Sequence, residues 1–205
     1  MFWYVKFNKG FDYGWIRTRW SDQYYQYETI SQTGNSVNFG DMTNNSNDTR
    51  AACASPSRGL YFGGITASIT NTIGFITIAT LGDAQDFGDL VDTANERGMG
   101  CSNAIRGLVA GGQTPTTTSN IDSVIIASKG NSITFGNLSA SNVNAGTNAA
   151  TNSPVRAVFS GGQAPSNTNA MEYIAIATGG ASSDFADLVR AQRGGAAVSN
   201  GHGGL

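Results

Sequence analysis

One arrangement of residues returns four times along this chain of 205 residues, and no other feature restricts its fold so strongly. A phenylalanine marks each copy; an isoleucine precedes it by nine residues and a glycine by five. An aspartate or asparagine follows it after two residues, and an apolar residue follows after three. The four phenylalanines are Phe39, Phe87, Phe135 and Phe185, at spacings of 48, 48 and 50 residues. Five markers that stay in phase predict about four repeats of ~48 residues each.

Each repeat contains short segments typical of β-strands. In FITIAT (75–80) β-branched and aromatic residues alternate with period two, which predicts a half-buried strand. The glycine that follows permits a tight turn. Further strands are expected at 86–90 (DFGDL), at 58–64 (RGLYFGG) and, most weakly, at 97–103. Each repeat is therefore expected to fold into three or four short antiparallel strands.

A period of 40–50 residues with four strands per unit is typical of a β-propeller blade. The glycine pairs at 63–64, 111–112 and 161–162 resemble those of kelch repeats in particular. We therefore predict an all-β, kelch-like β-propeller, with an open repeat array or a β-solenoid as the alternative. The repeats begin in mid-unit near Glu28. A ring of four blades would therefore close in one of two ways. Both ends of the chain would contribute strands to one blade, or a neighbouring subunit would supply the missing strand.

The segment 1–27 does not repeat and differs in composition from the predicted repeat domain, 28–205. It holds all three tryptophans, five of the seven tyrosines and three of the ten phenylalanines, with four basic residues against two acidic ones. Aromatic residues and arginine are enriched in the cores of stable interfaces. The segment is expected either to dock the repeat domain onto a larger assembly or to close the ring.

Composition excludes several classes of protein. Only 13% of the residues are charged and the net charge is −2, so the basic field of a nucleic-acid-binding protein is missing. No apolar run approaches the ~18 residues that a membrane span needs, and no secretory signal is expected at the start. Cys53 and Cys101 lie one repeat apart, which predicts one small buried position used twice and no disulfide.

The residues with reactive or charged side chains do not form a recognisable site in the sequence. His202 is the single histidine and stands in a glycine-rich tail, and the acidic run 83–89 lacks the spacing of a calcium loop. Arg58, Arg106 and Arg156 repeat in phase. They would either bind an anionic ligand or, as we expect, stack or bond between blades. No catalytic, cofactor-binding or metal-binding residue is predicted, and the chain is not expected to be an enzyme.

FITIATLGDAQDFGDL (75–90) and SPSRGLYFGG (55–64) resemble the kelch-like repeat proteins of marine tailed bacteriophages, notably cyanophages, and the likeness spans about residues 28–205. The resemblance implies a structural virion component of the tail, neck or capsid, such as an appendage or fibre, assembled in the host cytoplasm. It also implies other virion proteins as partners, and a homo-oligomer is expected. The alternative is an adhesin that attaches to the host by binding a surface glycan through the Thr/Ser/Asn-rich loops 111–120 and 161–170.

Overall fold

A computed structural model describes most of the repeat region of the chain. The described residues are 24–27, 33–43, 51–65, 68–91, 98–112, 117–139, 149–163, 166–193, 195–197 and 199. This part of the chain contains β-strands and no helix, which confirms the all-β prediction. The predicted segment 1–27 lies outside these residues except for its last four.

The strands form a two-stranded N-terminal sheet and three larger sheets, one for each successive repeat, in which all pairings are antiparallel except that of β14 with β10. The N-terminal sheet comprises β1 (Tyr24–Tyr27) and β2 (Val37–Asp41). The first repeat sheet comprises β3 (Ala51–Ala54), β4 (Arg58–Ile65), β5 (Ile69–Thr77) and β6 (Gln85–Asp89). The second comprises β7 (Met99–Ser102), β8 (Arg106–Ala110), β9 (Asn120–Ile125) and β10 (Ile133–Asn137), extended by β14 (Gly180–Ala181). The third comprises β11 (Ala149–Asn152), β12 (Arg156–Gln163), β13 (Asn167–Ala175) and β15 (Ser183–Gln192).

These boundaries confirm the strands expected from the sequence. The segments 58–64, 86–90 and 97–103 correspond to β4, β6 and β7. In every repeat sheet the first strand along the chain is an edge strand, and each following strand lies beside its predecessor. Such a meander is the simplest way to pair short strands joined by tight turns.

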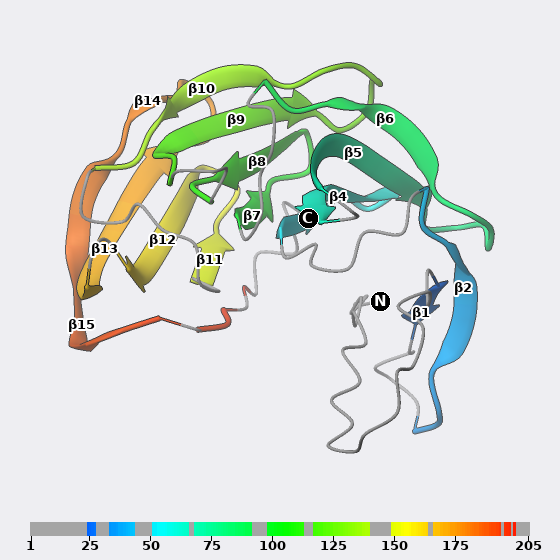
Figure 1. Ribbon diagram of the computed structural model, residues 1–205, viewed down its shortest axis with the longest axis horizontal. Coiled ribbons are helices and arrows are strands. Elements are labelled where there is room, and N and C mark those ends of the chain that lie inside the picture. The colour runs from blue at the N-terminus through cyan, green and yellow to red at the C-terminus, as the bar shows by residue number, and fades with distance from the viewer. Residues whose placement is uncertain are drawn as a thin grey trace.

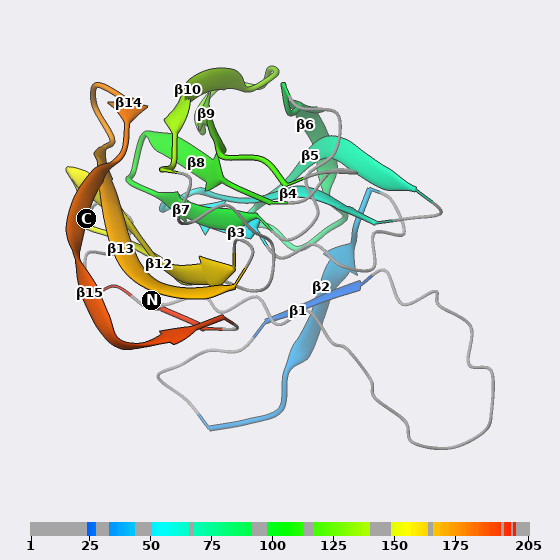
Figure 2. The same cartoon turned by 60° about the vertical axis from the view of Figure 1, so that its left-hand side comes forward.

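The sheets are arranged in sequence order along an arc (Figure 1), and the same order is visible after a turn of 60° (Figure 2). Each pair of neighbouring sheets encloses its own apolar core. Phe39 and Met42 of the N-terminal segment pack against Tyr61 and Ile76 of the first sheet. Between the first and second sheets the core includes Leu60, Phe62, Ile73, Val109 and Val124. Between the second and third sheets it includes Leu108, Ile121, Leu138, Phe159 and Ile174.

The expectation that 75–80 forms a half-buried strand is wrong in two respects. The strand β5 ends at Thr77, and the residues that follow it form a turn. The strand is also not half-buried. From Ile73 to Ile76 consecutive residues of β5 are all buried. Phe75 belongs to the core shared with the second sheet, while Ile76 belongs to the core shared with the N-terminal sheet. The strand is buried on both faces because its sheet lies between two others. Consecutive side chains therefore point alternately into two different apolar cores.

Neighbouring sheets also contact one another through backbone at their outer strands. The N–H groups of Gly82 and Gly130 donate to the carbonyls of Phe39 and Phe87, each at 2.9 Å. A Cβ atom added to Gly88 would lie 2.5 Å from the backbone of Gly130, and Gly40 and Gly136 meet Gly82 and Gly180 in the same way. Glycine after the marker phenylalanine is therefore required by the approach of the next sheet.

The described residues do not close this arc into a ring. Their strand pairings join no strand of the third sheet to β1 or β2, and Figure 1 shows the arc open on that side. The described part of the chain is therefore an all-β fold of several antiparallel sheets in a row.

We expect Gly88→Ala to lower the free energy of unfolding by about 2 kcal/mol or more, because the methyl group would overlap backbone that cannot move aside. Gly34→Ala is the matched control, since a Cβ atom there meets nothing within 4 Å. Urea denaturation of both variants measures the difference. Equal losses in the two variants would contradict the role assigned to the close approach.

Candidate functional site

The third sheet presents a face that has no counterpart elsewhere in the row. In the first two repeat sheets the equivalent face is covered by the next sheet. In the third, Phe185 is 47% exposed and Leu188 is half-buried, whereas Phe87, Leu90 and Leu138 at the equivalent positions of the first two repeat sheets are only 3%, 3% and 4% exposed. We call this face, formed by β12, β13 and β15, the open face. It is the strongest candidate for an interaction surface among the described residues.

The covered faces show how one sheet is attached to the next. Asp122 on β9 is 4% exposed, and its Oδ2 accepts hydrogen bonds from the Ser132 hydroxyl (3.1 Å) and from the backbone N–H of Val91 (3.2 Å). Ser132 Oγ accepts a second bond from that N–H at 2.9 Å. Val91 follows the outer strand of the preceding sheet. The Asp122–Ser132 pair therefore caps a backbone group of its neighbour, and we call this arrangement the inter-sheet cap.

The same cap recurs between the second and third sheets. Glu172, also 4% exposed, accepts bonds through Oε2 from the Ser182 hydroxyl (2.6 Å) and from the backbone N–H of Ser139 (2.9 Å). Asp122 and Glu172 both stand 13 residues before the marker phenylalanine of their repeat. Both side chains are buried, and each offers one carboxyl oxygen to a hydroxyl and to a backbone N–H, so that oxygen has hydrogen-bond donors in place of water.

The first repeat sheet builds the cap from a different residue. Its position equivalent to Asp122 is Gly74, and the Tyr61 ring occupies the space a side chain would need there, 2.0 Å from an added Cβ atom. The Tyr61 hydroxyl accepts from the backbone N–H of Thr43 at 3.1 Å and bonds its Oγ1 at 2.6 Å. Thr43 is the counterpart of Val91 and Ser139, so a phenol here performs the role of a carboxylate.

The N-terminal sheet carries the cap as well. Gln26 stands 13 residues before Phe39, and its Oε1 accepts a hydrogen bond from the Ser36 hydroxyl. Among the described residues no sheet lies against this side of β1 and β2. The Gln26–Ser36 pair therefore repeats the arrangement of Asp122 with Ser132 at a place where the described structure supplies no neighbour for it to cap.

Of the three arginines that repeat in phase, Arg58 and Arg106 lie at the sheet interfaces. Arg58 donates to the carbonyl of Ile126 in the next sheet at 2.8 Å, and Arg106 donates to that of Ile176 at 2.9 Å. Each guanidinium also lies over an aromatic ring, with Arg106 4.6 Å from the centroid of Phe135. The expectation that the arginines bond between repeat units is confirmed for Arg58 and Arg106. Arg156, on the open face, lies 4.8 Å over Tyr173 and is exposed.

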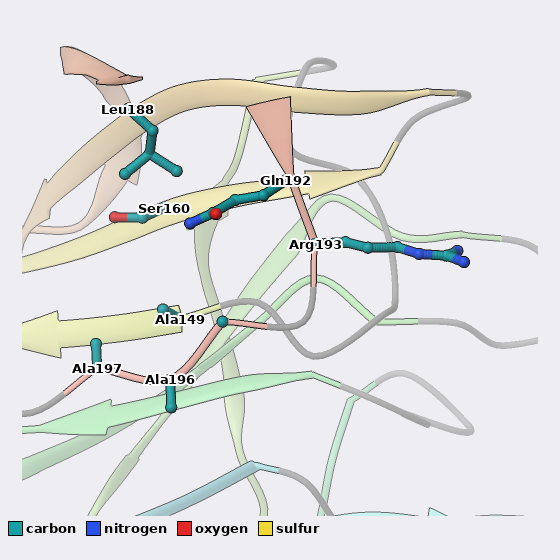
Figure 3. A pocket seen from close by; sticks show the side chains of 8 residues that line it. Ala149, Ser160, Leu188, Gln192, Arg193, Ala196 and Ala197 are labelled. Atoms are coloured by element: carbon teal, nitrogen blue, oxygen red, sulfur yellow. The ribbon is translucent and has the colours of Figure 1, made fainter. Parts of the chain in front are cut away.

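A segment after β15 covers part of the open face. A hollow of about 180 Å³ lies beside it. In Figure 3 Leu188 and Ser160 point into this hollow and Arg193 points away. The Ser199 hydroxyl donates to the carbonyl of Asn152, as the Ser102 hydroxyl donates to that of Ala54 at 2.6 Å. This segment therefore takes the place of an innermost strand. The hollow is smaller than the ~300 Å³ at which ligand pockets usually begin.

Other candidates from the sequence have structural roles or lie outside the described residues. In the acidic run, Asp83 accepts from the backbone N–H of Asp41 at 2.9 Å, which links two sheets. Within the described ranges no group of three or more His, Cys, Asp or Glu could hold a metal ion. His202 lies outside them. In the same ranges no helix is long and apolar enough to cross a membrane.

The two cysteines occupy equivalent places on inner strands and are free, as expected. Burial raises the pKa of the Cys53 thiol to about 12, and it raises the pKa of Cys101 as well. A thiol held in its neutral form is a poor nucleophile. Both cysteines therefore serve as small packing residues between sheets.

Sequence reasoning missed the inter-sheet caps, although a signal for them exists. The positions 13 and 3 residues before the marker phenylalanine pair Gln26 with Ser36, Asp122 with Ser132 and Glu172 with Ser182. The exception pairs Gly74 with Ala84, and in that sheet the counterpart of Val109 and Phe159 is Tyr61.

Comparison of this chain with protein-family models and with curated proteins gave no match.

We expect Tyr61→Phe to lower the free energy of unfolding by about 1 kcal/mol, because the Thr43 N–H loses its partner. The triple variant Tyr61→Val, Gly74→Asp, Ala84→Ser copies the cap of the second sheet and should regain much of that loss. Gly74→Asp alone is the control and should be destabilising, since it meets the Tyr61 ring. Thermal and urea unfolding give the order of the variants. A triple variant no better than Gly74→Asp would contradict the equivalence of the caps.

The thiols predict a pH dependence. Above about pH 9 the unfolded chain loses thiol protons that the folded chain keeps, because burial raises the folded-state pKa values. The free energy of unfolding should therefore be unaffected by the thiols below pH 9 and fall above it. Each thiol should add at most ~1.4 kcal/mol per pH unit to the slope with which the free energy of unfolding falls. Urea titrations from pH 7 to 10.5 should show a shallower fall for Cys53→Ala/Cys101→Ala. An unchanged slope would contradict the assignment.

Proposed function

We propose that this chain is a non-enzymatic structural protein of a tailed-bacteriophage virion, a tail, neck or capsid component built as a kelch-like β-propeller. One observation carries the proposal: the buried polar side chains of the repeats bind the backbone of a neighbouring sheet. Asp122, Glu172, Arg58 and Arg106 all make such bonds. Their polar chemistry is used in attaching sheets to one another, as a rigid scaffold requires.

The described parts of the loops support the structural role over the adhesin. The hydroxyls of Thr118 and Thr168 accept hydrogen bonds from the backbone N–H groups of Asn120 and Ala170, at 3.2 and 3.1 Å. Thr70 does the same for Thr72 at 3.1 Å. These threonines recur once per repeat and shape a turn, which is a common use of such residues. Residues 113–116 and 164–165 of the two loops lie outside the described residues.

The resemblance of the repeats to marine phage proteins supplies the setting. A repeat protein with a rigid interior and a free terminal face suits attachment to other virion proteins, with 1–27 as a second contact. Assembly then takes place in the host cytoplasm, and the protein leaves with the particle.

We expect mass spectrometry of purified particles, from lysates of cells infected by the phage that encodes this chain, to recover its peptides. The ratio to the major capsid protein should be fixed and should persist through density-gradient and salt washes, because structural components are bound in stoichiometric numbers. An abundant host cytosolic protein serves as the control and should be depleted by the same washes. Absence of the chain from washed particles would refute the assignment.

A further inference from the structure

We propose that the open face of the third sheet binds the N-terminal sheet of a second copy of this chain. The two surfaces are the two halves of the interface that the protein already uses between its own sheets. The proposal concerns the contact itself and does not depend on a location in a virion.

The first argument is continuity with the existing interfaces. A repeat sheet presents Phe, Leu and Arg at equivalent positions to the sheet that follows it, and the third sheet retains Phe185, Leu188 and Arg156. The inner position beside β11 is already taken by the segment that includes Ser199. The uncovered part of the open face lies toward β15.

The second argument is the free cap on the N-terminal sheet. Inside the chain the caps bind the backbone N–H of Val91 and Ser139, four residues after the marker phenylalanine. The equivalent residue of the third sheet is Val189 on β15. The Gln26–Ser36 pair has the right composition and position to cap the Val189 N–H of another copy.

A second polar contact would form beside the cap. The Oδ1 atoms of Asp83 and Asn131 accept from the backbone N–H groups of Asp41 and Asp89, at 2.9 and 3.0 Å. The N-terminal sheet has Asn35 at the equivalent position, and the third sheet has Asp187 as the counterpart of Asp41 and Asp89. Asn35 and Asp187 are both exposed in the isolated chain.

One residue shows that the contact between copies differs from the internal ones. Ala186 stands where Gly40, Gly88 and Gly136 stand, and those glycines touch backbone of the following sheet. A methyl group at that place keeps the two backbones farther apart. The contact between copies is therefore weaker than the contacts within the chain, as suits a joint that forms after folding. Within the described residues the two surfaces lie at opposite ends of one arc, which leaves both accessible to other copies.

Cysteine cross-linking tests the contact in the full-length protein. Asn35→Cys and Asp187→Cys are made as single variants, mixed and oxidised. We expect a disulfide-linked pair of chains on non-reducing gels, because the equivalent internal residues are within hydrogen-bond distance. Leu81→Cys, at an exposed turn of the first sheet, replaces Asn35→Cys in the control and should give no pair with Asp187→Cys. An intrachain disulfide in the double variant, with no pair from the mixed single variants, would overturn the proposal, as would no cross-link at all.

Sedimentation velocity measures the strength of the association without a cross-link. We expect Gln26→Ala to weaken association about fivefold or more, since it removes the cap, and Ala186→Gly to strengthen it by a similar factor, since it permits the close approach. Gln85→Ala, an exposed glutamine on the first sheet, should leave it unchanged. A wild-type chain that stays monomeric at all concentrations, or an Ala186→Gly variant that associates no better, would overturn the proposal.

Discussion

The first two repeat sheets have two apolar faces each, and the burial of both faces by neighbouring sheets is the constraint from which the rest of the structure follows. A single sheet of four short strands cannot bury enough surface to be stable alone. Here Phe62 and Ile73 gain their burial from the sheet that follows, and Tyr61 and Ile76 gain theirs from the sheet that precedes. The stability of each repeat is thus inseparable from that of its neighbours, as in other repeat proteins.

Sheets that pack this closely leave polar backbone groups without water, and these groups explain the polar positions that recur among the repeats. The N–H that follows each outer strand meets the face of the next sheet and must find an acceptor there. Asp122 and Glu172 supply a carboxylate, while the first sheet supplies the Tyr61 hydroxyl above Gly74. The solutions differ in chemistry but satisfy the same donor. Tyr61 and Gly74 together differ from the equivalent residues of the other repeats, because the Tyr61 ring fills the space that a side chain at position 74 would need.

The sequence predicted the strands well because they depend on local features that recur. Alternation, glycine pairs and the marker phenylalanines located β4, β6 and β7, and the phase of Arg58 and Arg106 correctly placed them between sheets. It failed where the outcome depends on the partner surface. The double burial of β5 and the caps of Asp122 and Glu172 arise between sheets, and no pattern within a single strand reports them. Closure of the arc depends on such contacts too, so period and count alone do not determine it.

Ala186 stands where the earlier repeats have glycine, and this difference distinguishes the contacts that form during folding from the contact that forms during assembly. Inside the chain a glycine after the marker phenylalanine lets backbone approach backbone, and the resulting interfaces form together with the sheets themselves. An alanine at the last position forbids that approach, yet Gln26, Asn35 and Ser36 preserve the polar side of the same interface at the other end of the chain. Polar groups that fix the register, combined with a looser fit, give a contact that is specific without being permanent. A repeat protein whose ends were as complementary as its interior would polymerise as readily as it folds, and a single methyl group opposes that outcome.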